Sequence, residues 1–305
     1  PKDTEVVATK GRTEESKRSY RTASEPAFPD LPIAVLINGS TASAAEIVAG
    51  ALQDLDRAVL LGQRSYGKGL VQATRPLGYN AMLKLTTAKY HIPSGRCIQA
   101  VDYSHSQEGS VSLVPDSLVS EFATRAGRKV YDGGGIMPDI RTEPEYMSRF
   151  AATLYALGFI DDFGDEYMRR NPEAPADLMA FAITDADYEA FKRFMEDKQV
   201  PYESDSRRAL RQLKEAAKAD RFGEIERQIE TIEAGLKDDT QANLETYRKE
   251  VTASIENDIV LRHGYSEAVV ARSLPKDKEV QRAAELLNDR PEYLRILAEQ
   301  DTQRK

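Results

Sequence analysis

The fold class follows from residues 32–61, which read PIAVLINGSTASAAEIVAGALQDLDRAVLL. The run starts with apolar and β-branched residues and ends with Ala-Val-Leu-Leu at 58–61, so each end predicts a strand. Between them, residues 43–55 place their apolar side chains at helical spacing. A strand, a helix and a second strand within about 30 residues are typical of a parallel βαβ unit, which predicts an α/β fold.

Further strands are expected on both sides of this unit. Residues 5–8 are rich in β-branched side chains, and residues 70–77 and 81–90 predict two strands around the turn Gly78-Tyr79-Asn80. A short helix is expected at residues 117–126. The three glycines at 133–135 predict a tight turn.

The second part of the chain predicts a mostly α-helical domain at residues 144–305. Residues 1–143 are nearly balanced in charge, whereas residues 144–305 carry an excess of acidic groups. We therefore expect a domain boundary between residues 143 and 144. Apolar stripes at helical spacing are typical of helix-packing faces rather than ligand sites. They comprise Tyr188, Phe191, Phe194 and Met195; Leu210, Leu213 and Ala217; Ile225, Ile229, Ile232 and Leu236; and Leu244, Tyr247, Val251, Ile255 and Ile259.

Composition excludes several classes of protein. The 305 residues are 41% hydrophobic and 30% charged, as in a globular protein, and no apolar run approaches the roughly 18 residues of a membrane-spanning helix. One cysteine, Cys97, excludes an internal disulfide, and three widely separated histidines argue against a histidine metal site. The net charge of −8 argues against nucleic acid as a partner.

One apparent nucleotide-binding motif does not fit its context. Residues 62–68 match the pattern G-x-x-x-x-G-K, but Gly69 replaces the Ser or Thr that would hold magnesium. A strand-like segment then follows at residue 70, where a phosphate site requires the start of a helix. We therefore expect no nucleotide site here.

Ser43 is a candidate nucleophile at the junction of the predicted strand and helix. Small neighbours allow a substrate to approach, and the start of a helix presents free N–H groups to an oxyanion. Ser43 and Glu46 also match a capping box, which explains the serine without any chemistry. Ser40 and Thr41 are alternative nucleophiles on the same loop.

A serine nucleophile needs a base, and Lys68 is a better candidate than any histidine. His91 is expected to be structural, His105 to lie in a solvated loop and His263 in the helical part. Lys68 lies between two glycines that allow its side chain to turn inward. Lysine titrates near about 10.4 in water, so such a base requires burial or cationic neighbours. An exposed loop lysine is the alternative interpretation.

These residues resemble a known family, the carboxyl-terminal processing, or tail-specific, peptidases. The resemblance covers roughly residues 5–140 and rests on several segments in the family's order. They are INGSTASAAEIVAGALQD at 37–54, GKGLVQ at 67–72, LTTAKY at 85–90, PSGR at 93–96 and GIMPD at 135–139. The family consists of serine–lysine proteases, and the resemblance implies part of a Clp protease/crotonase-like peptidase core. It also implies a hydrolase that is itself periplasmic or otherwise exported and uses no cofactor.

The resemblance assigns roles to individual residues. Ser43 matches the nucleophile, Lys68 the general base and Gln72 the residue that orients the lysine. The N–H of Ala44 matches an oxyanion donor, and Ala45 departs from the serine that is common in the family. A straight strand would hold Lys68 and Gln72 about 13 Å apart, so we expect a bend or bulge near Gly69.

The family also carries a PDZ domain and a glycine-rich oxyanion loop upstream of this point. Neither motif occurs in these 305 residues, so we expect the C-terminal portion of a longer, exported bacterial enzyme, which alone has little or no activity. The resemblance implies that the protein cleaves unstructured protein C-termini through a serine–lysine acyl-enzyme, and that the helical tail contacts a second copy or an adaptor.

The main alternative is a noncatalytic scaffold, in which Ser43 only caps a helix and the helical tail is an interaction surface. A third hypothesis, acyl-CoA chemistry of the crotonase type, has no cluster of basic residues to hold the CoA phosphates.

Overall fold

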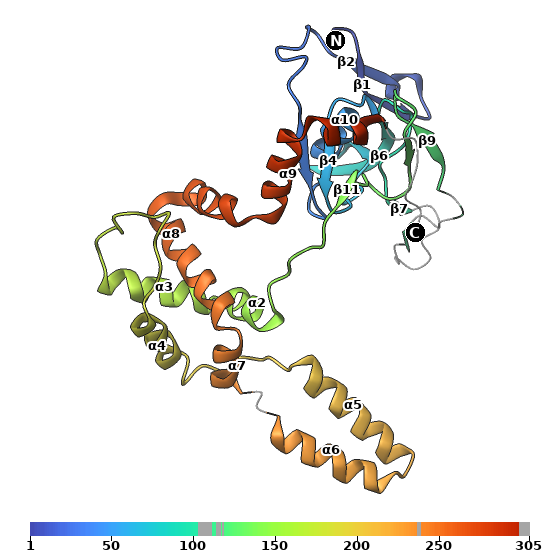
Figure 1. The fold of residues 1–305 in the computed structure, drawn as a ribbon. Coiled ribbons are helices and arrows are strands. Elements are labelled where there is room, and N and C mark those ends of the chain that lie inside the picture. The colour runs from blue at the N-terminus through green and yellow to red at the C-terminus, as the bar shows by residue number, and fades with distance from the viewer. Residues whose placement is uncertain (103–111, 114–116, 118, 237–238, 299–305) are drawn as a thin grey trace. The chain divides into compact units, whose positions relative to one another are not determined.

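The structure is a computed structural model, and it describes residues 1–305 except 103–111, 114–116, 118, 237–238 and 299–305. Contacts divide the chain into two units (Figure 1). The first comprises Pro1–Pro144 and the segment that begins at Asp277, and the second is Glu145–Lys276. The sequence pattern places a boundary near the first of these two junctions and gives no sign of the second.

The βαβ unit lies at the centre of the first unit. β3 (Ala34–Ile37) and β4 (Val59–Gly62) are parallel and are connected by α1 (Ala44–Asp54), which confirms the predicted arrangement. β11 (Ile140–Arg141) pairs with the other edge of β4, so β4 is central and all four of its residues are buried. The core beneath α1 combines Ile37 and Leu60 of this sheet with apolar residues from the rest of the unit.

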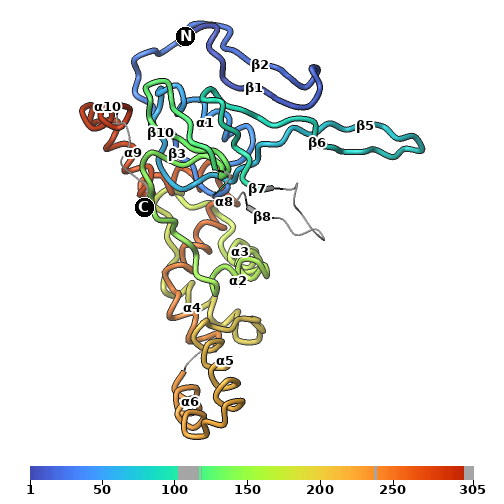
Figure 2. Tube along the Cα trace, turned by 90° about the vertical axis from the view of Figure 1, so that its right-hand side faces the viewer, coloured from blue at the N-terminus to red at the C-terminus, as the bar shows by residue number. Residues whose placement is uncertain are grey.

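A second, antiparallel sheet has the order β2-β1-β6-β5. Its strands are β1 (Glu5–Gly11), β2 (Arg18–Arg21), β5 (Leu70–Gly78) and β6 (Ala81–His91), and the short 3-10 helix Glu14–Ser16 connects the first two. The predicted hairpin around residues 78–80 is therefore confirmed. It is long, and Figure 2 shows its end extending well beyond the other strands of this unit.

Two small sheets complete the strands of the first unit. β7 (Val101–Asp102) pairs with β8 (Ser112–Leu113), and β9 (Glu121–Ala123) pairs with β10 (Lys129–Tyr131). The helix expected at 117–126 is therefore wrong where the structure describes it. Phe122 pairs with Val130, and Gly127, at φ 91°, lies in the connection between the strands. Pairing between these two strands thus outweighs the local helical pattern of the sequence.

The last two helices belong to the first unit. α9 (Lys278–Asn288) and α10 (Arg290–Ala298) bury Leu286 and Tyr293 against Val59 of the central strand. The hydroxyl of Tyr293 accepts a hydrogen bond from the Ile33 N–H at 3.1 Å and lies 3.3 Å from the Arg57 carbonyl. Apolar burial therefore explains why the chain returns to this unit at Asp277.

The second unit is helical, as predicted. Its core is formed mainly by α2, α3, α4, α7 and α8, and α5 and α6 pack against each other. Tyr247 separates α7 from α8, so the stripe from Leu244 to Ile259 covers two helices. The bounds are α2 (Arg149–Ala156), α3 (Phe159–Arg170), α4 (Asp185–Phe194), α5 (Asp205–Ala219), α6 (Gly223–Gly235), α7 (Thr240–Thr246) and α8 (Arg248–Ser273), followed by the 3-10 helix Leu274–Lys276. None of the helices in the described ranges is long and apolar enough to cross a bilayer.

Candidate active site

Ser43 lies at the turn between β3 and α1, and its backbone is strained. It is the N-cap of α1, with φ 58° and ψ −119°. An ordinary serine N-cap has an extended backbone. The serine, threonine and aspartate N-caps of α2, α4, α5, α7 and α9 all have negative φ angles. Capping alone therefore does not require this conformation, which is typical of a nucleophile on a sharp strand-to-helix turn.

The buried carboxylate of Glu46 organises the loop around Ser43. Its Oε2 accepts a hydrogen bond from the Ser43 N–H at 2.8 Å, which is the expected capping-box contact. Its Oε1 accepts hydrogen bonds from Ser65 Oγ at 2.5 Å and from the Gly67 N–H at 2.7 Å. The side chain of Ser65 in turn accepts from the Ile136 N–H at 2.7 Å. Hydrogen bonding to several donors compensates the burial of this charge.

The same carboxylate positions Lys68. The Lys68 N–H donates to Glu46 Oε2 at 2.8 Å, the distance that separates this oxygen from the Ser43 nitrogen. The two backbone nitrogens therefore lie no further apart than twice that distance. Gly67 has φ 85°, and a Cβ there would lie 2.2 Å from Ala100, so only glycine fits beside Lys68. The structure thus brings together the backbones of two residues that are 25 positions apart in sequence.

Gln72 lies on β5, and its side chain and that of Lys68 are both exposed. The expected irregularity is present: residues 67–69 are outside the strand, and the register with β6 shifts between Val71 and Gln72. The shift lies slightly beyond Gly69. Among the residues that the structure describes, no hydrogen bond joins the side chains of Ser43, Lys68 and Gln72.

The other residues of the loop have different roles. Ala44 is the first residue of α1, a position whose N–H has no partner within the helix. Thr41 Oγ1 accepts from the Asn38 N–H at 3.0 Å, and the Thr41 carbonyl accepts from Tyr66 at 2.9 Å. The Ser40 N–H donates to the Asn38 side chain at 2.9 Å. Of the three hydroxyl residues, only Ser43 has a positive φ.

Comparison with known proteins gives matches in both units. Residues 1–104 match the model of peptidase family S41, and residues 150–287 match the model of a C-terminal helical domain of probable PDZ-proteases. Both parts of the chain are thus similar to parts of proteases, the first of them to peptidase family S41.

The curated relatives in this family match only part of their own length. The carboxy-terminal-processing protease of Bartonella bacilliformis is 50% identical over 117 residues, which are 38% of this chain and 25% of that protein. The carboxyl-terminal-processing protease of Synechocystis sp. is 40% identical over 100 residues, 33% of this chain and 21% of that protein. A probable CtpA-like serine protease of Staphylococcus epidermidis is 31% identical over 121 residues, 38% of this chain and 24% of that protein.

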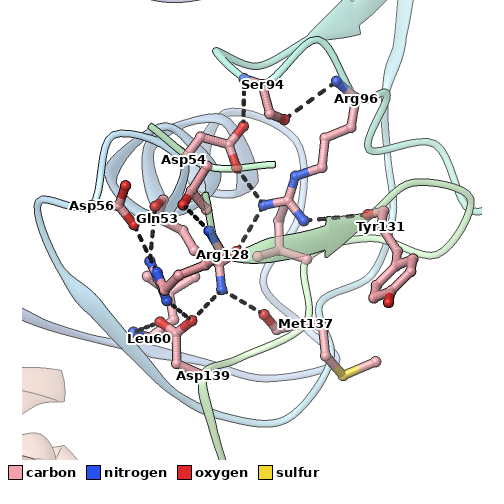
Figure 3. A network of polar contacts seen from close by, with 12 residues as sticks. Gln53, Asp54, Asp56, Leu60, Ser94, Arg96, Arg128, Tyr131, Met137 and Asp139 are labelled. Atoms are coloured by element: carbon pink, nitrogen blue, oxygen red, sulfur yellow. Dashed lines mark hydrogen bonds and ion pairs between the residues drawn. The ribbon is translucent and has the colours of Figure 1, made fainter. Parts of the chain in front are cut away.

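A buried polar network fixes the other end of α1 (Figure 3). Arg96 donates to Asp54 Oδ1 at 2.8 Å and to Gln53 Oε1 at 2.7 Å. Arg128 pairs with Asp139 at 2.6 Å and with Asp56 at 2.7 Å. These contacts explain the PSGR and GIMPD segments: they supply Arg96 and Asp139, which hold α1 in place and do not reach Ser43.

The two arginines of this network respond differently to burial. Burial lowers the pKa of Arg96, and Asp54 offsets this only in part. Burial also acts to lower the pKa of Arg128, but Asp139 and Asp56 outweigh it and the pKa is raised. The Nε of Arg96 is buried without a hydrogen-bond partner in the described part of the chain. The network therefore balances two buried cations against three carboxylates.

Among the described residues, no histidine forms a hydrogen bond with Ser43 or Lys68. His91 donates from Nδ1 to the Gly95 carbonyl at 2.9 Å, in line with the expected structural role. His263 lies on α8 in the second unit, and His105 is outside the described residues. Within the described ranges, no group of three or more His, Cys, Asp or Glu side chains could hold a metal ion.

The sequence predicts Ser43, Ala44, Lys68 and Gln72 as site residues and indicates Glu46 only as part of a cap. The signal for a larger role was an acidic residue in a segment otherwise made of small and apolar residues. Its long-range donors at residues 65–68 could not be predicted from helix periodicity.

Proposed function

We propose that this chain carries the nucleophile and the base of a serine-type endopeptidase that cleaves protein substrates near their C-termini. The observation that carries the proposal is the shared attachment of Ser43 and Lys68 to Glu46 Oε2, at 2.8 Å each. This shared contact holds the backbones of Ser43 and Lys68 near each other, which supports their roles as nucleophile and base.

In the first half of the reaction, the Lys68 Nζ accepts the proton of Ser43 Oγ as this oxygen attacks the substrate carbonyl. The Ala44 N–H donates to the oxyanion of the tetrahedral intermediate. When the intermediate collapses, the C–N bond breaks, and the leaving amine takes the proton from Lys68. The product is an ester between Ser43 and the N-terminal part of the substrate.

In the second half, Lys68 accepts a proton from water as the water oxygen attacks the ester carbonyl. Collapse releases the carboxylic acid product, and Ser43 Oγ recovers its proton from Lys68. Gln72 orients the Lys68 amine in this scheme. Because both side chains are exposed in the structure, we expect them to approach each other when substrate covers the site.

The proposal extends to substrate and location. The names of the relatives describe carboxyl-terminal processing, which supports unstructured protein C-termini as substrates. We place the enzyme outside the cytoplasm, in the periplasm of a bacterium. We assign contacts with a second copy or an adaptor to the helical unit. Analytical ultracentrifugation of the chain, alone and with candidate adaptors, tests this assignment.

The test is cleavage of an unstructured polypeptide, with the product termini mapped by mass spectrometry. The match covers about a quarter of the length of the relatives. The assay therefore uses two samples, the 305-residue chain and a chimera. In it, residues 1–104 replace the matching segment of the Bartonella bacilliformis protease. Ser43→Ala and Lys68→Ala are compared with Ser40→Ala and Lys89→Ala, which change an exposed loop serine and an exposed strand lysine.

We expect the chimera to cleave and both site variants to lose at least about 1,000-fold in rate, with the two control variants active. Cleavage that survives Ser43→Ala would identify a different nucleophile, and Ser40→Ala then tests the neighbouring hydroxyl. Activity retained by Lys68→Ala would remove lysine as the base. A folded chimera that cleaves nothing would contradict the proposal.

A further inference from the structure

The end of the β5–β6 hairpin exposes large apolar side chains. Leu77, Met82 and Leu83 are between 45% and 62% exposed, and Tyr79 is fully exposed. These residues lie around the turn, at the end that extends beyond the other strands (Figure 2). Singly exposed apolar residues are common on soluble proteins, but a cluster of four on one projecting turn is typical of an interaction surface.

The turn itself does not account for Tyr79. Gly78, Tyr79 and Asn80 all have positive φ angles, of 86°, 49° and 58°. Glycine, asparagine and aspartate adopt this conformation at low cost, whereas a bulky aromatic residue does so rarely. Tyr79 has no neighbour that buries it, so its side chain contributes nothing to the fold that offsets this strain.

The hairpin carries the cations Arg75, Lys84 and Lys89 and no carboxylate, in a chain of net charge −8. No aspartate or glutamate occurs between Asp56 and Asp102. The basic residues in this interval are Arg57, Arg64, Lys68, Arg75, Lys84, Lys89 and Arg96.

Two of these basic residues lie just behind the apolar tip. Arg75 pairs with Leu83, and Lys84 with Thr74, so both flank the last strand pairs before the turn. Both side chains are exposed, and neither has an ion-pair partner among the described residues. Arg75 is thus level with Leu83, Lys84 is one strand pair further from the turn, and both cations lie behind Leu77, Tyr79 and Met82.

We propose that this tip inserts into the surface of a bilayer that contains anionic phospholipid. Leu77, Tyr79 and Met82 would enter the boundary between headgroups and acyl chains, where tyrosine is favoured. Arg75 and Lys84 would then lie at the level of the phosphates, and each cation near an anionic surface strengthens binding about fivefold. A protein partner could also cover apolar side chains, but the absence of carboxylates and the order of tip and cations match a lipid surface.

The inference does not depend on the proposed peptidase activity, because binding to vesicles needs no cleavage. If both hold, the bilayer lies close to the active site. β5 begins at Leu70, two residues after Lys68. At about 3.3 Å per residue, the strand to Leu77 separates Lys68 from the hairpin tip by roughly 25 Å. Substrate tails near the membrane surface would then be within reach.

A tryptophan reporter provides a direct test, because the chain contains no tryptophan. Tyr79→Trp is compared with Tyr146→Trp, which replaces an exposed tyrosine outside the hairpin. Each 305-residue variant is titrated with vesicles of phosphatidylcholine alone and with vesicles that also contain phosphatidylglycerol. We expect the emission of Tyr79→Trp to shift to shorter wavelength only with the anionic vesicles, and the emission of Tyr146→Trp not to shift.

Cosedimentation with the same vesicles measures affinity. Arg75→Gln with Lys84→Gln should weaken binding about 30-fold, whereas the control pair Lys218→Gln with Arg227→Gln on the helical unit should leave it unchanged. Tyr79→Asn should also weaken binding to the vesicles. Because asparagine adopts the backbone conformation of this turn more readily than tyrosine, unfolding of the turn would not explain the weaker binding.

Three results would overturn the inference. The first is that folded chain fails to bind anionic vesicles, as judged by circular dichroism and cosedimentation. The second is binding that is equal on zwitterionic vesicles or unaffected by Tyr79→Asn. The third is concentration-dependent self-association without vesicles that Tyr79→Asn abolishes, which would assign the tip to a second protein chain.

Discussion

At the scale of single residues, Glu46 links the two halves of the candidate site. It is fully buried and accepts hydrogen bonds from Ser43, Ser65, Gly67 and Lys68. Three of these donors are backbone N–H groups, so the carboxylate fixes chain segments rather than side chains. A carboxylate is suited to this place because it offers acceptors only.

Glu46→Gln should therefore reduce both stability and activity. The amide NH2 would face N–H donors and leave at least one of them unpaired, at a cost of about 2 kcal/mol. A displacement of Ser43 from Lys68 by about 1 Å would lower the cleavage rate about 100-fold. Urea unfolding and the chimera's cleavage assay measure the two effects.

Asp187→Asn is the matched control for this prediction. Asp187 also accepts from its N-cap residue, at 2.9 Å, but it is only half-buried and lies in the helical unit. Its loss should cost at most about 1 kcal/mol and leave cleavage unchanged. Equal activity of Glu46→Gln and the parent would show that the shared carboxylate is not needed to position the site.

His91 predicts a dependence of stability on pH. Its pKa is lowered because the ring is partly buried and because Lys10 and Lys89 repel the imidazolium, against the opposing effect of the Gly95 carbonyl. As the pH falls below about 6.5, the unfolded chain binds a proton that the folded chain does not yet bind. This contribution to stability is therefore complete above that pH and is lost as the pH falls towards the lower, folded pKa.

His91→Gln removes this loss. Urea midpoints measured from about pH 7.5 to about pH 5 should fall less steeply for the variant than for the parent. Equal slopes for the two chains would mean that the folded and unfolded states protonate His91 alike.

At the scale of elements, local pattern predicts the segments that carry a clear apolar spacing or turn signal. The βαβ unit shows a strand–helix–strand pattern and the β5–β6 hairpin has turn residues at 78–80, so these signals suffice. The short strand Glu121–Ala123 was not predicted because three residues carry little periodicity, and its partner at 129–131 decides its conformation. The attachment of residues 65–68 to Glu46 was missed for the same reason.

The kink in α8 offers a test of backbone strain. Tyr265 has φ 57° and ψ −170° inside an otherwise helical segment, a conformation that essentially only glycine adopts without strain. Its side chain is exposed and buries little area. Tyr265→Gly should therefore stabilise the second unit by about 1 kcal/mol, as measured by the urea midpoint.

Val270→Gly is the control in the same helix. Val270 is exposed but has a helical backbone, so glycine there should destabilise by roughly 0.5 kcal/mol. If Tyr265→Gly also destabilises the unit, the contacts of the Tyr265 side chain contribute more to stability than its backbone strain costs.

At the scale of the whole molecule, the units do not follow the order of the chain. Unit 1 takes up residues from both ends, because Leu286 and Tyr293 complete its core beside Val59. Composition alone assigns these helices to the acidic, helical part, since charge and helical periodicity do not specify which surface a helix covers. The separate cores predict two unfolding transitions.

Leu286→Ala tests where the C-terminal helices belong energetically. Leu286 is fully buried in the first unit and Leu154 in the second, and each truncation to alanine should cost about 2–5 kcal/mol. Differential scanning calorimetry should show that Leu154→Ala lowers one transition and Leu286→Ala the other. Val59 lies on β4, which α1 connects to β3 in the same sheet. Glu46→Gln on α1 should therefore lower the same transition as Leu286→Ala. If Leu286→Ala instead lowers the transition that Leu154→Ala marks, the last helices stabilise the helical unit, and the candidate site is held together by Pro1–Pro144 alone.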